Sequence, residues 1–381
     1  MNRRARTILT AATAVALSAA LAGPAVAAPP TGHDATRQAV RAAVAEGVPG
    51  VTVRVQRGHG VWAATAGVGN LKTGEPRSTR DHYRIGSASK TFIATVVLQL
   101  AAEGELSLDD TVEKWLPGVV HGNDHDGSRI TIRQLLNHTS GVFDLLADET
   151  FQRTYMLKEG FFRHRFDTTT PRDLVAMAMT NRRDFEPGTS WKYSNTNYIL
   201  AAMVIEKITG RPYGEAVEAR VIEPLGLTAT SVPRTRTTVP QPSSRAYNKL
   251  ARTPDGPAYD VTEFSPSFAY SGEMISDSAD LNRFFSALLR GKVLPPRQLK
   301  EMKRMVPTTK KNERYGLGLR SYELSCHKTV WGHGGDIHGS SSMAVTTSDG
   351  RHSLAVNFNG DWSGETKSVV EAEFCGARSG R

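Results

Sequence analysis

The stretch SASKTFIATVVLQLAAE, residues 87–103, decides the fold. It predicts a helix along its whole length, and residues 91–102 are apolar on nearly every side. A helix with so few polar positions belongs in the centre of a protein rather than on its surface. Ser87 and Lys90 lie three residues apart at the start of this helix, so the serine hydroxyl and the lysine amine share one face and can meet.

This pair has the chemistry of a nucleophile and its base. A serine hydroxyl attacks a carbonyl only when a base beside it takes its proton. A lysine buried at the positive end of a helix has a lowered pKa and can be that base. The helix N-terminus also favours negative charge on a reacting carbonyl oxygen. Because Ser-x-x-Lys arises readily by chance, the interpretation of Ser87 and Lys90 as a catalytic pair needs support from other segments of the sequence.

Strand patterns occur near both ends of the chain, with helix patterns between them. Residues 50–67 predict two strands, since Val51, Val53 and Val55 alternate with polar neighbours. Further strands are expected at 315–322, 328–331, 341–347 and 352–359, and further helices at 131–137, from 171, and at 197–210, 278–290, 296–306 and 366–374. We therefore predict an α/β plus all-α fold: one antiparallel sheet formed by both chain ends and flanked by helices (about 28–105 and 266–375), with an inserted helical lobe (about 106–265).

The first 27 residues predict a signal peptide. Three arginines precede an apolar stretch at 8–21, and the small residues 25–27 follow it. A membrane anchor needs ~20 apolar residues, so we expect cleavage near Ala27 and a secreted protein whose mature form has no membrane anchor. Residues 28–375 are then one catalytic domain, and 376–381 a tail.

Charge and composition narrow the function classes. The 381 residues carry a net charge of +9, which falls to +6 once Arg3, Arg4 and Arg6 are removed. The basic residues are scattered without aromatic interleaving, so nucleic acid is not an expected partner. A small cluster in a Gly-rich loop lacks the spacing of a zinc hydrolase, so we expect neither a metal nor another cofactor. That cluster comprises His121, Asp124, His125 and Asp126.

Two other segments carry polar groups suited to a site. Tyr193-Ser194-Asn195 directly precedes a predicted helix, and its phenol and amide could relay a proton and hold a substrate amide. The alternative is a polar loop that caps the helix. His333-Gly334-Gly335 follows a predicted strand, and its glycines would let another backbone, such as an extended substrate, approach closely. The alternative is a simple glycine turn with a surface histidine.

The order Ser-x-x-Lys, Tyr-x-Asn, His-Gly-Gly resembles the serine penicillin-recognising family, which includes class C-like β-lactamases, DD-peptidases and related esterases. Residues 84–86, 132–141, 186–188 and 315–319 are also similar to that family, and the resemblance spans about 51–375. It is strongest to secreted actinomycete D-alanyl-D-alanine carboxypeptidases. The resemblance implies a β-lactamase/transpeptidase-like fold and a disulfide between Cys326 and Cys375; on the residues alone, two buried free thiols remain an alternative.

The resemblance also implies roles. Ser87 would be acylated, Lys90 would take its proton, Tyr193 would share the relay to the leaving amine, and His333 would support Tyr193. Substrate-binding roles fall to Asn195, Gly334, Gly335, Asp336 and Arg320. Asn195 would hold the acyl amide, the backbone amides of Ser87 and Asp336 would form the oxyanion hole, and Arg320 would bind a substrate carboxylate. Phe268 and Tyr270 are candidates for an aromatic wall.

We therefore expect a D-alanyl-D-alanine carboxypeptidase, which cleaves peptides ending in D-Ala-D-Ala and is acylated by β-lactams. We expect the protein to be a monomer. The carboxypeptidase pattern favours hydroxyl residues after the histidine of the third motif, and here Gly334 and Asp336 replace them. The acid at Asp336 would repel a substrate carboxylate unless Arg320 or His338 offsets it. Three alternative activities therefore remain: a β-lactamase, a D-aminopeptidase or amidase, and an esterase. Asp336 favours them because an acid could bind a substrate amine. An inactive penicillin-binding or wall-binding module is a further alternative, which the three intact motifs disfavour.

Overall fold

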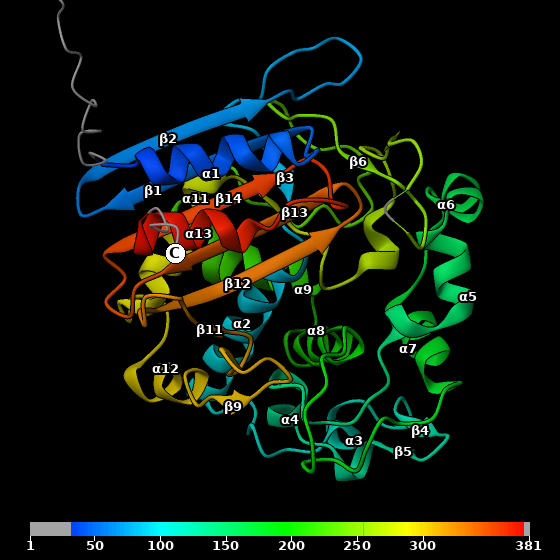
Figure 1. Cartoon of the computed structure of the whole chain (residues 1–381). Helices are drawn as coiled ribbons and strands as arrows, with labels where there is room; N and C mark the ends of the chain where they lie inside the picture. The colour runs from blue at the N-terminus through cyan, green and yellow to red at the C-terminus, as the bar shows by residue number, and fades with distance from the viewer. Residues whose placement is uncertain (1–31, 254, 377–381) are drawn as a thin grey trace, which may run out of the picture. The chain divides into compact units, whose positions relative to one another are not determined.

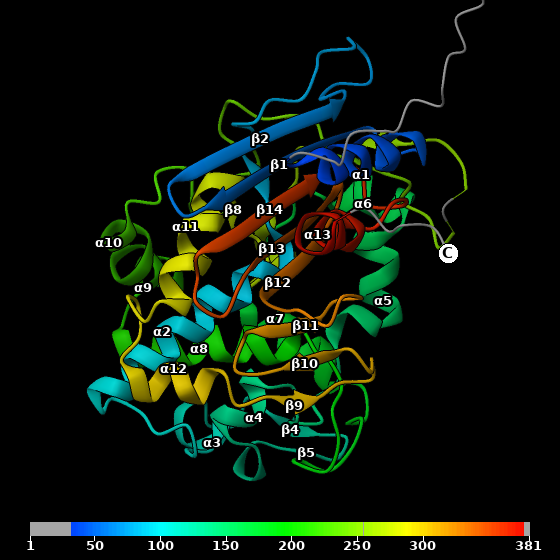
Figure 2. The same cartoon turned by 60° about the vertical axis from the view of Figure 1, so that its left-hand side comes forward.

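An antiparallel sheet of eight strands joins the two ends of the chain, in the order β2-β1-β14-β13-β12-β11-β10-β9 (Figure 1). Its register places Val53 of β1 opposite Val356 of β14, and Met343 of β13 opposite the same Val356. The strands are β1 (Gly50–Arg57), β2 (Gly60–Gly67), β9 (Val306–Pro307), β10 (Glu313–Tyr315), β11 (Arg320–Glu323), β12 (Thr329–Ile337), β13 (Ser340–Thr346) and β14 (His352–Phe358). The predicted sheet of both chain ends is confirmed, and Figure 2 shows the strands succeeding one another from β2 to β9.

The structure is a computed structural model that describes residues 32–253 and 255–376. The predicted signal peptide and residues 377–381 of the predicted tail lie outside the described residues. Within the described ranges, no helix combines the length and apolar character needed to cross a membrane.

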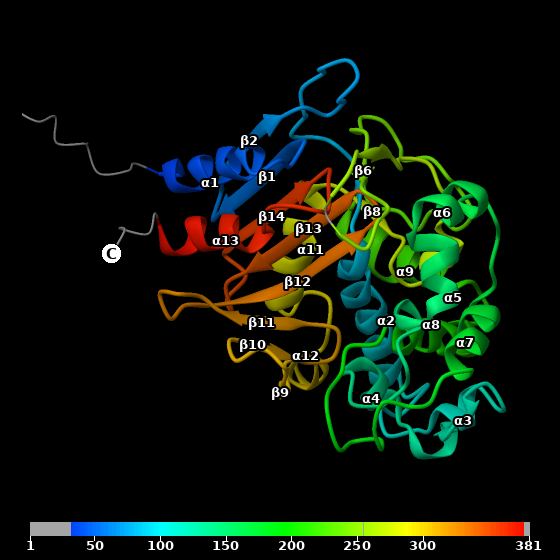
Figure 3. The ribbon, with the colours of Figure 1, turned by 45° about the vertical axis from the view of Figure 1, so that its right-hand side comes forward.

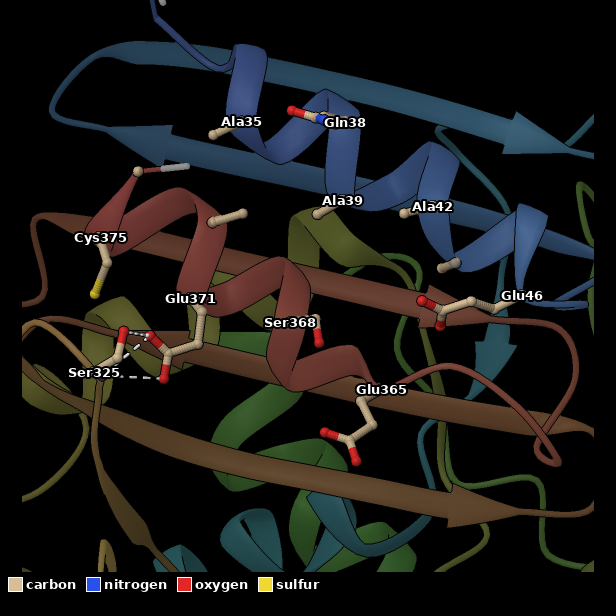
Figure 4. A pocket seen from close by; sticks show the side chains of 13 residues that line it. Ala35, Gln38, Ala39, Ala42, Glu46, Ser325, Glu365, Ser368, Glu371 and Cys375 are labelled. Carbon is tan, nitrogen blue, oxygen red and sulfur yellow. Dashed lines mark hydrogen bonds between the residues drawn. The ribbon is translucent and has the colours of Figure 1, made fainter. Parts of the chain in front are cut away.

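Helices cover both faces of the sheet. On one face lie α1 (Asp34–Ala45) and α13 (Thr366–Cys375), and on the other lies α11 (Ser278–Leu289) (Figure 3). The alternating valines of β1 are buried because they face a core shared with α1 and α13. A shallow groove remains between these two helices, lined by small side chains such as Ala39 and Ser368 (Figure 4).

A second, larger core surrounds α2 (Ser89–Glu103), whose apolar residues are almost completely buried. This helix packs against α8 (Thr196–Thr209), α9 (Tyr213–Val217) and α12 (Pro296–Met302), which explains why it tolerates so few polar positions. The remaining helices are α3 (Val112–Trp115), α4 (Ile132–Leu136), α5 (Glu149–Phe151), α6 (Lys158–His164), α7 (Pro171–Met179) and α10 (Glu223–Leu225). Three two-stranded sheets complete the fold: β3 (Tyr83–Arg84) with β8 (Ile275–Ser276), β4 (His121–Gly122) with β5 (His125–Asp126), and β6 (Tyr247–Asn248) with β7 (Tyr259–Asp260).

Several predicted boundaries were wrong. The central helix begins at Ser89 rather than Ser87, because Gly86–Ala88 forms a 3-10 turn ahead of it. The strand expected at 328–331 continues to Ile337, because its glycine-rich half pairs fully with β13. The strand expected at 315–322 is broken by a tight turn between β10 and β11. The helix α1 had no counterpart in the sequence-based assignment.

Candidate active site

Ser87 and Lys90 meet as the sequence predicted. Ser87 lies in the 3-10 turn before α2, and the Lys90 side chain rises from the first turn of that helix. The Lys90 Nζ lies 3.1 Å from the Ser87 Oγ, which is hydrogen-bonding distance. Lys90 is only 1% exposed, whereas Ser87 is half-buried and so can be reached by a substrate.

Burial sets the protonation of this lysine. Loss of hydration lowers the pKa of Lys90 to about 7, the Arg320 guanidinium lowers the pKa further, and the Asp144 and Glu273 carboxyl groups oppose both effects. A large fraction of Lys90 is therefore a free amine near neutral pH. A free amine at hydrogen-bonding distance can accept the serine proton.

The Tyr193–Asn195 segment faces the same point. Asn195 Oδ1 accepts a hydrogen bond of 2.8 Å from Lys90, and the Asn195 side chain makes no capping bond to α8 within the described part of the chain. The capping alternative for Asn195 is therefore wrong. The Lys90 Nζ lies 5.2 Å from the centroid of the Tyr193 ring. Burial raises the pKa of Tyr193, so this side chain is a neutral phenol.

Asp144 fixes the orientation of Asn195. Its carboxylate accepts hydrogen bonds from the Asn195 backbone N–H at 2.9 Å and from the side-chain Nδ2 at 3.2 Å. Because the amide nitrogen is held by Asp144, the amide oxygen must face Lys90. Burial raises the pKa of Asp144, although the Asn195 hydrogen bonds oppose that rise.

His333 is a buried, neutral histidine rather than a surface residue. It is 1% exposed, and burial together with Arg320 lowers its pKa well below the ordinary value. Its Nδ1 lies 2.5 Å from the Gly334 carbonyl oxygen, so Nδ1 carries the proton. Its Nε2 therefore accepts the hydrogen bond of 2.9 Å from the Tyr315 hydroxyl. Tyr193 lies beside this pair, with its ring centroid 6.5 Å from that of His333.

Two glycines let β12 touch the serine turn. A methyl group on Gly335 would lie 1.9 Å from the Ile85 carbonyl oxygen and 2.7 Å from the Ser87 nitrogen. A methyl group on Gly86, whose φ is +51°, would lie 2.7 Å from the Asp336 nitrogen. The close approach that the glycines were expected to allow is therefore made by the chain's own serine turn. It places the Ser87 nitrogen beside Gly335 and the Asp336 nitrogen beside Gly86.

Two hollows of different character meet at Ser87. The first, which we call the apolar cavity, is lined by Ser87, Asn195 and Asp336 and by Leu145, Leu146, Phe151, Met156, Ile199, Phe268, Ala269, Tyr270, Gly272, Ile337 and His338. Both candidates for an aromatic wall, Phe268 and Tyr270, thus line it. The Tyr270 hydroxyl donates to Glu206 Oε1 at 2.7 Å.

The second hollow, which we call the charged trough, is larger and more open. It is lined by Ser87, Tyr193, His333, Gly334, Gly335 and Asp336, by Lys310, Glu313, Arg320, Tyr322 and Lys367, and by Ser341, Ser342, Met343, Gly364, Glu365 and Thr366. Asp336 is exposed between the two hollows, and its Oδ1 accepts a 2.6 Å hydrogen bond from Ser341. Arg320 is not free, because its Nη1 lies 3.0 Å from Glu313 Oε2.

The remaining predicted residues lie elsewhere. Cys326 and Cys375 are joined by a disulfide that ties α13 to the loop after β11. In the loop around β4 and β5, Asp124 pairs with Arg182, and His125 Nδ1 contacts the Gly122 carbonyl oxygen. Across the described residues, no group of three or more His, Cys, Asp or Glu side chains is placed to hold a metal ion.

Sequence reasoning missed four residues that shape the site: Asp144, Glu273, Glu313 and Tyr315. Asp144 orients Asn195, and Tyr315 holds the proton position on the buried imidazole. Glu273 accepts from the Tyr213 hydroxyl, and its own pKa is raised by burial to about 7. Two of them were within reach, because Tyr315 opens the 315–319 stretch of the resemblance and Asp144 follows its 132–141 stretch by three residues.

Comparisons with known proteins agree with this geometry. The family profile described as Beta-lactamase matches residues 36–370. A D-stereospecific amidohydrolase from Streptomyces sp. has a structure with a TM-score of 0.86 and 56% identity, covering 90% of this chain and 99% of that one. The D-amino acid amidase from Ochrobactrum anthropi SV3, in complex with L-phenylalanine amide, has a TM-score of 0.74 and 29% identity, covering 86% and 91%.

A curated relative extends the comparison. Penicillin-binding protein 4* of Bacillus subtilis (strain 168) is 31% identical over 188 residues, which are 48% of this chain and 38% of that protein. The chain spans less than two thirds of the length of this relative and of three further curated relatives. The resemblance drawn from the sequence is confirmed: the chain belongs to the Beta-lactamase family and has that family's β-lactamase/transpeptidase fold.

Proposed function

We propose that the chain is a serine hydrolase that forms an acyl-enzyme on Ser87 and acts on amides of D-amino acids. The observation that carries the proposal is the 3.1 Å contact between Ser87 Oγ and a buried lysine whose pKa is lowered to about 7. That contact supplies an activated nucleophile without a histidine base, since the buried imidazole is bonded to the Tyr315 hydroxyl instead.

The chemical steps follow from the positions of the groups. Ser87 Oγ attacks the amide carbonyl carbon while its proton passes to Lys90 Nζ. The carbonyl oxygen becomes an oxyanion held by the backbone amides of Ser87 and Asp336, each worth ~3 kcal/mol in such sites. The C–N bond then breaks, and the leaving amine takes its proton through the Tyr193 phenol. Water hydrolyses the Ser87 ester by the reverse route, with Lys90 again as the base.

The two hollows divide the substrate. Asn195 lines only the apolar cavity, whereas Tyr193 lines only the charged trough. Because Tyr193 would deliver a proton to the leaving amine, the leaving group lies in the trough and the acyl side chain in the apolar cavity. That cavity favours apolar acyl side chains, since its walls are largely aliphatic and aromatic.

Specificity for D-amino acid amides rests on two supports. One is the likeness to a D-stereospecific amidohydrolase and to a D-amino acid amidase. The other is Asp336, an exposed carboxylate beside Ser87 that would attract the free amine of an unblocked aminoacyl substrate.

The second candidate is the D-alanyl-D-alanine carboxypeptidase expected from the sequence. The penicillin-binding relative favours it, and acylation of Ser87 by β-lactams belongs to this proposal. The pairing of Arg320 with Glu313 disfavours it, because that arginine was the group expected to receive the substrate carboxylate.

A four-substrate panel tests the proposal. D-phenylalanine amide, L-phenylalanine amide, a peptide ending in D-Ala-D-Ala and benzylpenicillin are each incubated with the wild type and with Ser87→Ala. We expect ammonia release from the D-amide at least tenfold faster than from the L-amide, and none from the variant. Absence of D-amide turnover at high enzyme concentration, or equal turnover by the variant, would contradict the proposal.

A further inference from the structure

The charged trough holds an unusual arrangement around Glu313. This residue lies on β10 with its side chain only 5% exposed. Its Oε2 lies 3.0 Å from Arg320 Nη1, and its Oε1 lies 3.7 Å from Lys310 Nζ and 3.9 Å from Lys367 Nζ. One buried carboxylate therefore lies within 4 Å of three cations that line the same hollow as Ser87, and its shortest contact is with Arg320.

The hairpin geometry keeps this arrangement in place. In the pairing of β10 with β11, Glu313 is opposite Tyr322 and Tyr315 is opposite Arg320. The Arg320 guanidinium carbon also lies 5.2 Å from the ring centroids of Tyr193 and Tyr315. Arg320 is thus held between two aromatic rings and one carboxylate, so its guanidinium is already partnered where the leaving group would lie.

We propose that Glu313 determines leaving-group specificity: by occupying Arg320, it makes the trough favour leaving groups without a carboxylate, such as ammonia or a neutral amine. The inference rests on the proposed amide hydrolysis and names the class of amide. A leaving amino acid would bring its own carboxylate to Arg320. It would have to displace Glu313, which would leave a buried carboxylate short of partners. The exposed Asp336 and Glu365 in the same trough add repulsion.

Two substrates with one acyl group measure this preference. D-phenylalanine amide releases ammonia, whereas D-phenylalanyl-D-alanine releases an amino acid that carries a carboxylate. In Glu313→Gln the side chain keeps its shape but loses its charge, which replaces the ion pair with Arg320 by a weaker neutral hydrogen bond. We expect the kcat/KM ratio of dipeptide to amide to rise at least tenfold, chiefly through a lower KM for the dipeptide.

Glu365→Gln is the matched control. It removes one negative charge from an exposed position in the same trough without any contact to Arg320 within the described ranges. Its ratio should change much less than that of Glu313→Gln. Equal changes in the two variants would show that only the net charge of the trough matters, and would overturn the inference. No change of the ratio in Glu313→Gln would overturn it as well.

The failures are distinguishable. If the wild type releases no ammonia from D-phenylalanine amide, the proposed function fails; if it does and the ratio in Glu313→Gln stays constant, only the role of Glu313 fails. Should Glu313→Gln not fold, turnover by the wild type decides the question. The wild type should release D-phenylalanine from D-phenylalanyl-D-alanine amide with a higher kcat/KM than from D-phenylalanyl-D-alanine, and the opposite order would contradict the inference.

Discussion

Replacing Asp144 by asparagine should move the pH dependence of the enzyme. The Asp144 carboxylate holds the Asn195 amide at 2.9 and 3.2 Å, and the same amide contacts Lys90 at 2.8 Å. Asp144 supports the charged form of Lys90 more strongly than Glu273 does. Its removal should lower the pKa of Lys90.

The size of the shift follows from this geometry. Two hydrogen bonds in series separate the charges by roughly 6–8 Å, which at an effective dielectric constant of ~20 corresponds to ~2 kcal/mol, or ~1.5 pKa units. Activity requires the free amine of Lys90, so kcat/KM rises with pH through the pKa of this group. In Asp144→Asn the midpoint of that rise should therefore lie about one unit or more below the wild-type midpoint.

A pH series of kcat/KM from pH 5 to 9 on D-phenylalanine amide gives both midpoints. Asp144→Ala is the companion variant, because it removes the hydrogen bonds to Asn195 as well as the charge. Its plateau should fall about 10- to 100-fold, as expected for loss of a charged hydrogen bond. A midpoint in Asp144→Asn equal to or above that of the wild type would refute the reasoning.

Three further predictions concern stability and packing. Lys90→Met should abolish turnover yet raise the melting temperature. Burial lowers the pKa of Lys90 from 10.5 to about 7, so between these pH values the unfolded chain binds a proton that the folded chain does not. The stability of the wild type therefore rises with pH across that window. In thermal denaturation, the stability advantage of the variant over the wild type should grow as the pH falls from 10 to 7. Gly335→Ala should cost far more activity and stability than Gly334→Ala, because the added methyl would lie 1.9 Å from a backbone oxygen in the first case and no nearer than 3.4 Å to any atom in the second; similar losses would contradict the close approach of β12. Replacing Cys326 and Cys375 by serine should lower the free energy of unfolding by ~4 kcal/mol on the chain-entropy estimate for a loop of 49 residues, measured by urea denaturation against the oxidised wild type.

Local patterns predicted the parts of the fold that depend on neighbouring residues. The central helix could be recognised because its apolar character is continuous in the sequence, and the Ser87–Lys90 contact follows from helical spacing. The strand predicted at 328–331 ended too early because Gly334 and Gly335 disfavour strands locally. Pairing with β13 overrides that preference.

The missing parts of the site depend on long-range contacts. Asp144 and Asn195 form their hydrogen bond although they are 51 residues apart in the sequence, and no local pattern predicts that contact. Glu313 and Arg320 are seven residues apart, but they meet only because a tight turn folds β10 onto β11, which the sequence had suggested to be one strand. The sequence showed that Asp336 departs from the family pattern. Its position between the apolar cavity and the charged trough could be seen only in the structure.

The identity of the acylated residue tests the central claim most directly. The wild type is trapped with benzylpenicillin or with a slowly hydrolysed D-phenylalanine ester, digested, and mapped by mass spectrometry. We predict one acyl adduct, on the peptide that contains Ser87, and none in Ser87→Ala. An adduct on another residue, or an unmodified Ser87 in an enzyme that turns over the same ester, would contradict it.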